Sequence, residues 1–196
     1  MSVTAVIRPG ETDFDQQDRI LGTLDLPLNE HGESQLDEIV DALRSLSIKQ
    51  LYTSPTDPAL STANAVGEAL DINVKELELL ANVNQGLWQG LCIDEIKRKQ
   101  PKIYKLWREN PESVCPPEGE SCAEAFERAQ KALRKPMKKN VNFAVVVSEP
   151  MATVVECVLR REELRMPALN GREDEPLVQL IETTKPETVV VVPPEK

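Results

Sequence analysis

Short apolar runs, each followed by turn-forming residues, recur along the chain and predict the strands of a buried sheet. The first is Val3–Ile7, which ends at an Arg-Pro-Gly turn over residues 8–10. Phe143–Val147 is continuous and apolar, as a central strand of a parallel sheet is. Shorter runs predict further strands at Gln50–Thr53 and Val74–Leu77.

Between these runs, apolar residues return every three or four positions, which predicts helices with one buried face. Asn29 is a suitable N-cap for the first long helix, and Ser121 opens a later one. Because strands and helices alternate, we predict an α/β protein, a three-layer α/β/α sandwich with a mostly parallel central sheet. Its helices are expected over about 34–46, 60–70, 93–99, 103–108, 121–133 and 152–160.

Two parts of the chain fit this alternation less well. Residues from about 78 to 119 are irregular apart from two charged helical stretches, so we expect an insertion there. The tail from about residue 161 holds two candidate edge strands, Leu177–Ile181 and Thr188–Val192, and prolines at 193 and 194 would end the second. With 196 residues, we predict one domain over residues 1–196.

An excess of acids sets the electrostatics of the chain. It carries 33 Asp and Glu against 23 Lys and Arg, a net charge of −10. A field of that sign repels nucleic-acid phosphate and anionic membranes, so we predict neither as a partner. The four cysteines form no CxxC pair, so we expect reduced thiols, no zinc and a cytoplasmic protein, although Cys115 and Cys122 are near enough to approach across a loop. We interpret the basic run Lys97–Lys99 as one solvated helix face.

Seven short motifs follow one another between residue 3 and about residue 160. They are Ile7–Thr12 (IRPGET), Arg19–Gly22 (RILG), Asp25–Gly32 (DLPLNEHG), Thr53–Ala59 (TSPTDPA), Gly86–Gly90 (GLWQG), Pro116–Ser121 (PPEGES) and Val146–Pro150 (VVSEP). In this order and spacing they resemble the signature of the histidine phosphatase (phosphoglycerate mutase-like) superfamily. The resemblance implies that family's fold, with a site in the loops at the carboxyl ends of the strands.

The resemblance also implies a reaction. In the family pattern one histidine attacks phosphorus, a second histidine and two arginines bind the phosphate, and a glutamate protonates the leaving oxygen. The matching positions hold Pro9 (nucleophile), Glu149 (second histidine), Pro58 with Asp57 beside it (second arginine) and Asn82 (general acid). None of these side chains performs the matching role, so we expect no catalytic residue at these four positions.

Of the charged pocket only Arg8 remains, together with Glu11. The chain has a single histidine, His31, so one subunit cannot assemble a two-histidine mechanism, and we expect His31 to have a surface or capping role. Two opposite charges about 4 Å apart attract by about 4 kcal/mol at an effective dielectric constant near 20. We therefore expect Arg8 and Glu149 to pair and to fill the vacated phosphate site.

Two interpretations of that pair stay open. One is a buried ion pair that keeps the fold intact. The other is a remodelled pocket that binds something other than a phosphoester. Its acids suggest a cation, but no spacing motif supports one, so we predict no metal and no cofactor. The residues of this residual pocket are Arg8, Glu11, Asp15, Asn82 and Glu149.

Four chemical positions have changed while scaffold residues such as Gly10, Pro55, Gly86 and Glu120 remain. We therefore expect a non-catalytic, histidine-phosphatase-like pseudoenzyme with a binding, regulatory or assembly role. The alternative is a phosphatase or phosphoglycerate-mutase-type enzyme, or a small-molecule sensor, that uses the remodelled pocket. The partner is then an unknown protein or a small molecule, and the resemblance makes a homodimer possible.

Overall fold

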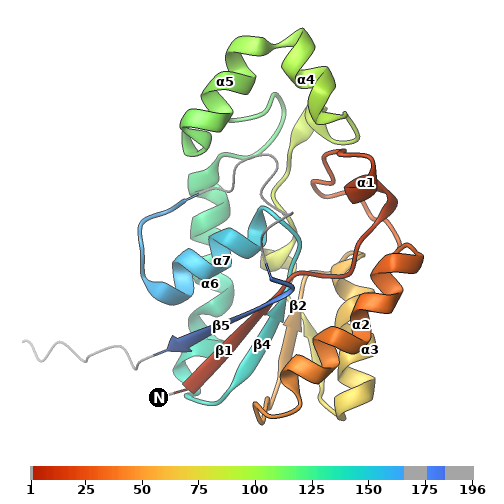
Figure 1. Cartoon of the computed structure of the whole chain (residues 1–196). Helices are drawn as coiled ribbons and strands as arrows, with labels where there is room; N and C mark the ends of the chain where they lie inside the picture. Colours follow the sequence, from red (N-terminus) through yellow and green to blue (C-terminus); the bar gives the residue numbers. More distant parts are fainter. Residues whose placement is uncertain (1, 166–175, 184–196) are drawn as a thin grey trace, which may run out of the picture.

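A five-stranded sheet lies at the centre of the computed structural model, which describes residues 2–165 and 176–183 (Figure 1). The strands run in the spatial order β3-β2-β4-β1-β5. β4 pairs in parallel with both β1 and β2, and β2 pairs in parallel with β3, whereas β5 is antiparallel to β1. The strands are β1 (Ser2–Ile7), β2 (Leu51–Thr53), β3 (Val74–Glu76), β4 (Phe143–Val146) and β5 (Val178–Thr183).

The central position of β4 follows from its composition. Each of its residues is buried, because helices cover both faces of the sheet at this point. Val6 and Val145 point into one core cluster, while Ala5 and Ile7 point into the other, as alternation along a strand requires. The expected mostly parallel sheet is therefore confirmed, with its one antiparallel strand at an edge.

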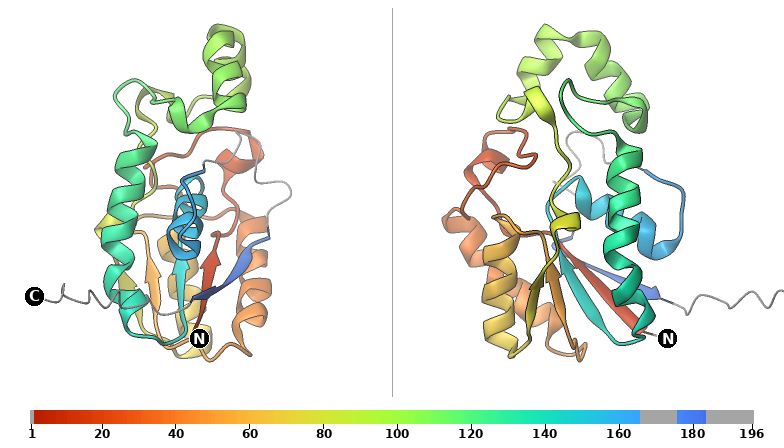
Figure 2. Two further views of the ribbon diagram at one scale, coloured as in Figure 1. Left: turned by 90° about the vertical axis from the view of Figure 1, so that its left-hand side faces the viewer. Right: turned by 180° about the vertical axis from the view of Figure 1, so that it is seen from behind.

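Helices form the two outer layers of the sandwich, and Figures 1 and 2 show them on either side of the sheet. One face carries α2 (Glu30–Leu43) and α3 (Ala59–Leu70). The other carries α6 (Cys122–Lys138) and α7 (Met151–Arg160). The predicted three-layer α/β/α architecture is confirmed.

Side-chain caps fix where two of these helices begin. Asn29 accepts a hydrogen bond from the backbone N–H of Gly32, so α2 begins at Glu30 as the N-cap prediction requires. The N-cap of α6 is Ser121, which exchanges hydrogen bonds with Glu124 in a capping box. The end of α2 was placed too late, because the helix stops at Leu43 and the following turn needs a left-handed backbone at residue 47.

The irregular segment from 78 to 119 rises above the carboxyl ends of the strands (Figure 1). Both helical stretches expected there are present. Its core is a stacked pair of indole rings, Trp88 and Trp107, whose centroids lie 5.1 Å apart, so these two residues pack as expected. A short helix, α1 (Asp13–Gln16), was not predicted. The segment contains η1 (Glu78–Leu80), η2 (Gly86–Trp88), α4 (Ile93–Lys99), α5 (Pro101–Glu109) and η3 (Pro111–Ser113).

The tail contributes the edge strand that its pattern predicted, since β5 covers most of Leu177–Ile181 and lies outermost beside β1. The second candidate, Thr188–Val192, lies outside the described residues. Among the residues that the structure describes, no helix is both long enough and apolar enough to cross a membrane.

Candidate functional site

Three loops meet at the carboxyl ends of neighbouring strands. The backbone N–H of Val147 donates to the carbonyl of Ile7 over 3.0 Å, and that of Ser54 donates to the carbonyl of Val146 over 3.2 Å. Arg8, the first residue after β1, donates its own N–H to the carbonyl of Leu177 over 2.8 Å. The sheet therefore brings the loops after β1, β2 and β4 to one edge, as the sequence predicted.

Arg8 is the buried charge at the centre of this edge. Only 2% of its side chain is exposed. Its Nε and Nη2 groups both lie 2.7 Å from Oε1 of Glu149, which is 18% exposed. The expected pairing of Arg8 with Glu149 is therefore confirmed, in the short geometry of a charge-assisted hydrogen bond.

A second carboxylate, which the motifs do not predict, also binds Arg8. Oε1 of Glu156 accepts a hydrogen bond from Nη2 of Arg8 over 3.0 Å. Glu149 lies two residues before the start of α7, and Glu156 lies within the helix, seven residues further along the chain. That spacing was the available signal. One buried cation thus sits between two anions, and the three side chains together carry a formal charge of −1.

Further hydrogen bonds fix Glu149 in place. Its two carboxylate oxygens accept from the hydroxyl of Thr153 over 3.2 and 3.0 Å, and Oε2 also accepts from the backbone N–H of Thr153 over 3.3 Å. A carboxylate before the first turn of a helix is also favoured by the helix dipole. Glu149 is therefore held by α7 independently of Arg8.

Asn82, which the resemblance matches to the family's general acid, links two loops by hydrogen bonds. Its Nδ2 donates to the carbonyl of Gly22 over 2.9 Å and to the carbonyl of Glu149 over 2.8 Å. Its Oδ1 accepts from the backbone N–H groups of Val83 and Met151 over 2.8 and 3.3 Å. The amide of this buried residue is thus fully used in fixing the backbone, including that of Glu149.

In the loop after β2, Asp57 and Pro58 have structural roles at the start of α3. Pro58 immediately precedes α3, and the side chain of Asp57 accepts hydrogen bonds from the N–H and hydroxyl of Ser61 over 2.9 and 2.6 Å. Asp57 thereby satisfies a donor in the first turn of α3. Pro58, which the resemblance matches to the family's second phosphate-binding arginine, carries no charge.

The other two residues of the predicted pocket hold their own loop together. Oε1 of Glu11 accepts from Nδ2 of Asn29 over 2.9 Å. Oδ2 of Asp15 accepts from both the N–H and the hydroxyl of Thr12, each over 2.8 Å. Within residues 2–165 and 176–183, no group of three or more His, Cys, Asp or Glu side chains is arranged to hold a metal ion. The single histidine, His31, is exposed in the first turn of α2.

The loop after β1 is fixed by a close approach of two glycines. A Cβ on Gly10 would lie 2.4 Å from the carbonyl oxygen of Gly32, and a Cβ on Gly32 would lie 2.1 Å from that of Glu11. The N–H of Gly10 also donates to the hydroxyl of Thr62 over 3.2 Å. The loop that carries Pro9 therefore has a tight geometry.

A half-buried ion pair below the irregular segment was also not predicted. Nη2 of Arg128 lies 2.6 Å from Oε1 of Glu120, and the same guanidinium donates to the carbonyls of Leu79, Ala81 and Asn82 over 2.9, 2.6 and 3.0 Å. This contact fixes the segment that carries Asn82. The role of Arg128 depends on a contact across 46 residues, which no local pattern reveals.

A family model for the histidine phosphatase superfamily (branch 1) matches residues 5–192. The chain belongs to this superfamily. It is 28% identical over 142 residues to phosphoserine phosphatase 1 of Hydrogenobacter thermophilus, a match that covers 72% of this chain and 67% of that protein. It is 30% identical to the uncharacterized phosphatase PhoE of Bacillus subtilis over 53% of this chain and 54% of that protein. A probable phosphoglycerate mutase, GpmB of Klebsiella pneumoniae, is 30% identical over 65% of this chain and 60% of that protein.

Solved structures share this fold. YhfR of Bacillus stearothermophilus superposes with a TM-score of 0.78 at 23% identity, over 93% of this chain and 91% of that one. A mycobacterial glucosyl-3-phosphoglycerate phosphatase, in its complex with VO3, superposes with a TM-score of 0.76 at 22% identity, over 87% and 84% of the two chains. At this level of identity the likeness concerns the fold.

Burial makes the Cys122 thiol a poor nucleophile. Cys122 is buried, and desolvation, followed by the proximity of Cys115, raises its pKa to about 11. The Cys122 thiol is therefore protonated near neutral pH, and the thiolate is the reactive form. All four cysteines are free.

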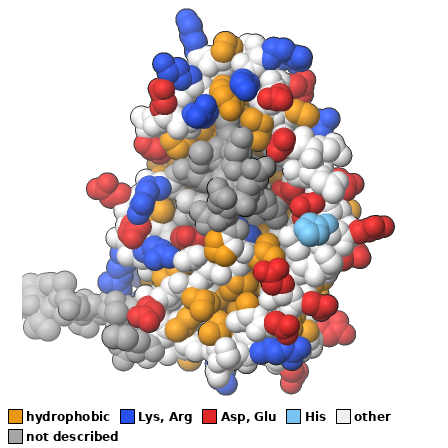
Figure 3. Space-filling model, viewed as in Figure 1, with side chains coloured by type: hydrophobic (Ala, Val, Ile, Leu, Met, Phe, Trp, Pro, Cys, Tyr) orange, Lys and Arg blue, Asp and Glu red, His pale blue; other side chains and the backbone are white. Residues whose placement is uncertain are grey.

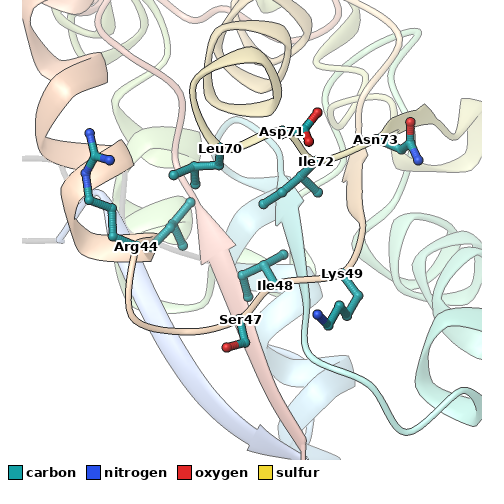
Figure 4. A pocket seen from close by; sticks show the side chains of 9 residues that line it. Arg44, Ser47, Ile48, Lys49, Leu70, Asp71, Ile72 and Asn73 are labelled. Carbon is teal, nitrogen blue, oxygen red and sulfur yellow. The ribbon is translucent and has the colours of Figure 1, made fainter.

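A pocket of about 310 Å³ lies at the opposite edge of the sheet from these loops (Figure 4). Residues 47–49 and 70–73, which line it, precede β2 and β3, so the pocket is at the amino ends of those strands. Ile48, Leu70 and Ile72 are among the side chains that line it. It includes none of the residues of the predicted residual pocket.

Proposed function

We propose that this chain is a non-catalytic member of the histidine phosphatase superfamily, which keeps the fold for a binding, regulatory or assembly role. The observation that carries the proposal is the state of Arg8. Two carboxylates already occupy the guanidinium at 2.7 and 3.0 Å, where the family pattern requires a phosphate ligand.

Charge is the first physical reason. A phosphate dianion that approached Arg8 would meet Glu149 and Glu156, and like charges about 4 Å apart repel by about 4 kcal/mol per unit pair at an effective dielectric constant near 20. Displacing the carboxylates instead would leave them partly buried without their cation, which is also unfavourable. The site is thus suited to an internal ion pair and poorly suited to a phosphoester.

The second reason is the absence of the reacting groups at the matching positions. Pro9 has no side-chain lone pair for attack on phosphorus. Asn82 has no acidic proton, and its amide is already hydrogen-bonded on both sides. Together with Pro58 and Glu149, these residues remove the nucleophile, the acid and two phosphate contacts.

A second candidate function comes from the relatives. Those quoted above carry the names of a phosphoserine phosphatase, a phosphatase and a probable phosphoglycerate mutase. If the chain shares such an activity, or senses a related small molecule, it does so in a remodelled pocket of Arg8, Glu11, Asp15, Asn82 and Glu149. This alternative requires a nucleophile other than histidine, or one supplied by a partner.

Turnover measurements distinguish the two functions. The purified chain is assayed with p-nitrophenyl phosphate, phosphoserine and 3-phosphoglycerate, beside an Arg8→Ala, Glu149→Ala double variant. We expect no phosphate release above the level of that variant. Release that the double variant loses would establish the enzyme and overturn our proposal, whereas equal release in both preparations identifies a contaminating phosphatase.

We further propose that residues 1–196 form a single domain, with the irregular segment at about 78–119 as an insertion and a weakly matched tail from about 161. Its support is the contact of Arg128, on α6, with the backbone of residues 79–82 at the start of that segment. Limited proteolysis tests it, because an independent insertion would be released as a stable fragment.

A further inference from the structure

The outer helices of the irregular segment form a basic region on an acidic protein. Six of the 23 Lys and Arg residues fall between residues 97 and 108, a stretch without any acid, which leaves 17 bases against all 33 acids elsewhere. Two of the six pair with acids of their own helix, Lys99 with Glu95 and Lys105 with Glu109. All six are exposed: Lys97, Arg98, Lys99, Lys102, Lys105 and Arg108.

Apolar side chains accompany these charges on α5. Tyr104 and Trp107 face the body of the protein, where they join the cluster around Trp88. Ile103 and Leu106, one turn apart on the helix, remain 37% and 44% exposed. No residue of α5 is fully buried. We call the exposed side formed by Lys102, Ile103, Lys105 and Leu106 the α5 surface; basic residues that flank exposed aliphatic ones are typical of a docking helix.

A second exposed apolar region lies on the edge of the sheet. β5 is the outermost strand. Because side chains alternate along a strand, Val178, Leu180 and Glu182 lie on the same face of the sheet as the core cluster that contains residues of α2. Leu180 is 47% exposed, and Leu177 and Val178 are only partly buried. We call Leu177, Val178 and Leu180 the β5 face. Figure 3 shows apolar side chains gathered in the lower part of the molecule, with acidic side chains beside them.

The surroundings of the β5 face are acidic. Glu182 is exposed on the strand itself. The neighbouring helix α2 adds five exposed acids, against one arginine in the turn that follows it. These acids are Glu30, Glu33, Asp37, Glu38 and Asp41. A basic, apolar helix therefore complements this region in both charge and polarity.

The two surfaces cannot meet within one molecule. α5 lies at the top of the views in Figures 1 and 2, while β5 and α2 lie toward the lower end, on the other side of the site loops. We propose that the α5 surface of one copy docks on the β5 face of a second copy. Because the two patches differ, the contact is heterologous and extends head to tail into chains or a ring. This inference is independent of whether the site is catalytic.

Charge and apolar contact have different parts in this assembly. Exposed ion pairs contribute little to affinity, so the lysines and acids mainly steer the encounter and fix its orientation. Ile103, Leu106 and Leu180 supply the area that leaves water. Association should therefore weaken when the Debye length falls from about 10 Å at 0.1 M salt to about 3 Å at 1 M, without vanishing as a purely ionic contact would.

Three variants of the full chain test the proposal by sedimentation equilibrium at low salt. The α5 variant is Lys102→Glu with Lys105→Glu, and the β5 variant is Leu180→Lys, each at exposed positions. The control, Lys131→Glu with Lys135→Glu, makes the same charge change on the exposed side of α6. We expect the wild type and the control to self-associate, and each test variant to do so at least about tenfold more weakly, or about 1.4 kcal/mol.

An equimolar mixture of the two test variants gives the sharper result. The β5 variant keeps an intact α5 surface and the α5 variant keeps an intact β5 face, so the mixture should form a one-to-one pair that does not extend further. Such a pair also demonstrates that both variants are folded. A wild type that stays monomeric at every concentration, an α5 variant that associates like the control, or a mixture that stays monomeric would each overturn the proposal.

The other occupant of a basic, apolar helix is an anionic membrane. Flotation with phosphatidylserine vesicles, beside neutral phosphatidylcholine vesicles, addresses it with the same variants. We expect no flotation of the wild type with either. Flotation with the anionic vesicles that the α5 variant loses would assign the α5 surface to a membrane and contradict the docking of a second copy.

Discussion

Replacing Glu149 by glutamine tests the buried ion pair with the smallest change of shape. The side chain keeps its length and one carbonyl oxygen, but it loses its charge and one acceptor. Arg8 keeps Glu156 as a partner at 3.0 Å, so the guanidinium is not left entirely unpaired. The hydrogen bonds from Thr153 weaken as well, since an amide nitrogen cannot accept them.

The expected cost follows from burial. Removing one partner of a fully buried pair costs about 3–5 kcal/mol, and a hydrogen bond to a charged group contributes about 1.5–3 kcal/mol. The lower of these two ranges, that of a hydrogen bond to a charged group, applies here because Arg8 keeps Glu156 and Glu149 is 18% exposed. We expect Glu149→Gln to lower the free energy of unfolding by about 2 kcal/mol, which corresponds to a fall in Tm of about 4–8 °C for a chain of this size.

Urea denaturation followed by circular dichroism measures the change, with Asp41→Asn as the matched control. Asp41 forms an exposed pair with Arg44 at 2.9 Å, whose side chains are 74% and 63% exposed, so its loss should cost less than about 0.5 kcal/mol. The Glu149 effect should also persist at about 1 M salt, because a buried pair is poorly screened. A Glu149→Gln variant as stable as Asp41→Asn would refute the inference that the pair stabilises the fold.

Three further outcomes are expected. Gly10→Ala should destabilise the chain by about 1–3 kcal/mol in urea denaturation, because its Cβ would meet the backbone oxygen of Gly32 at 2.4 Å; an unchanged midpoint would contradict the close packing of that loop. Burial raises the pKa of Cys122 to about 11, so in alkylation at pH 7 followed by mass spectrometry the exposed Cys115 should react much faster than Cys122. Equal rates would contradict the burial of the Cys122 thiol. Backbone and side-chain hydrogen bonds lower the pKa of Glu124 below 4.5. The stabilisation from its carboxylate should therefore be complete above pH 4.5 and disappear as the pH falls through the lower folded-state pKa. A Glu124→Gln variant should not show that part of the acid-induced loss of stability.

Short apolar runs in the sequence predicted the strands of the sheet, and the family motifs predicted the ion pair at the site. β4 was predicted to be central because a strand covered on both faces has no polar alternation. Arg8 and Glu149 were expected to meet because the family resemblance places both at the phosphate site and their charges are opposite, and they do meet. The sequence therefore predicts each strand and the residues that follow it, and the parallel sheet brings those residues together.

Contacts that depend on long-range packing were not predictable in the same way. Glu156 lies among apolar residues of α7, and only the position of Arg8 distinguishes it from a solvated helical acid. Arg128 resembles any exposed helical arginine until the carbonyls of residues 79–82 are placed against it. The four-residue helix α1 depends on the capping box of Thr12 and Asp15, which is too short to produce a hydrophobic period.

Binding of orthovanadate, a phosphate-like oxyanion, tests the central claim most directly. Wild type and Arg8→Ala are heated with increasing vanadate, and the unfolding temperature of each is followed. Our account predicts no shift for the wild type, because Glu149 and Glu156 already occupy Arg8. A saturable stabilisation of the wild type, which would reach about 2.7 kcal/mol at 100 times the dissociation constant, and its loss in Arg8→Ala would contradict the account.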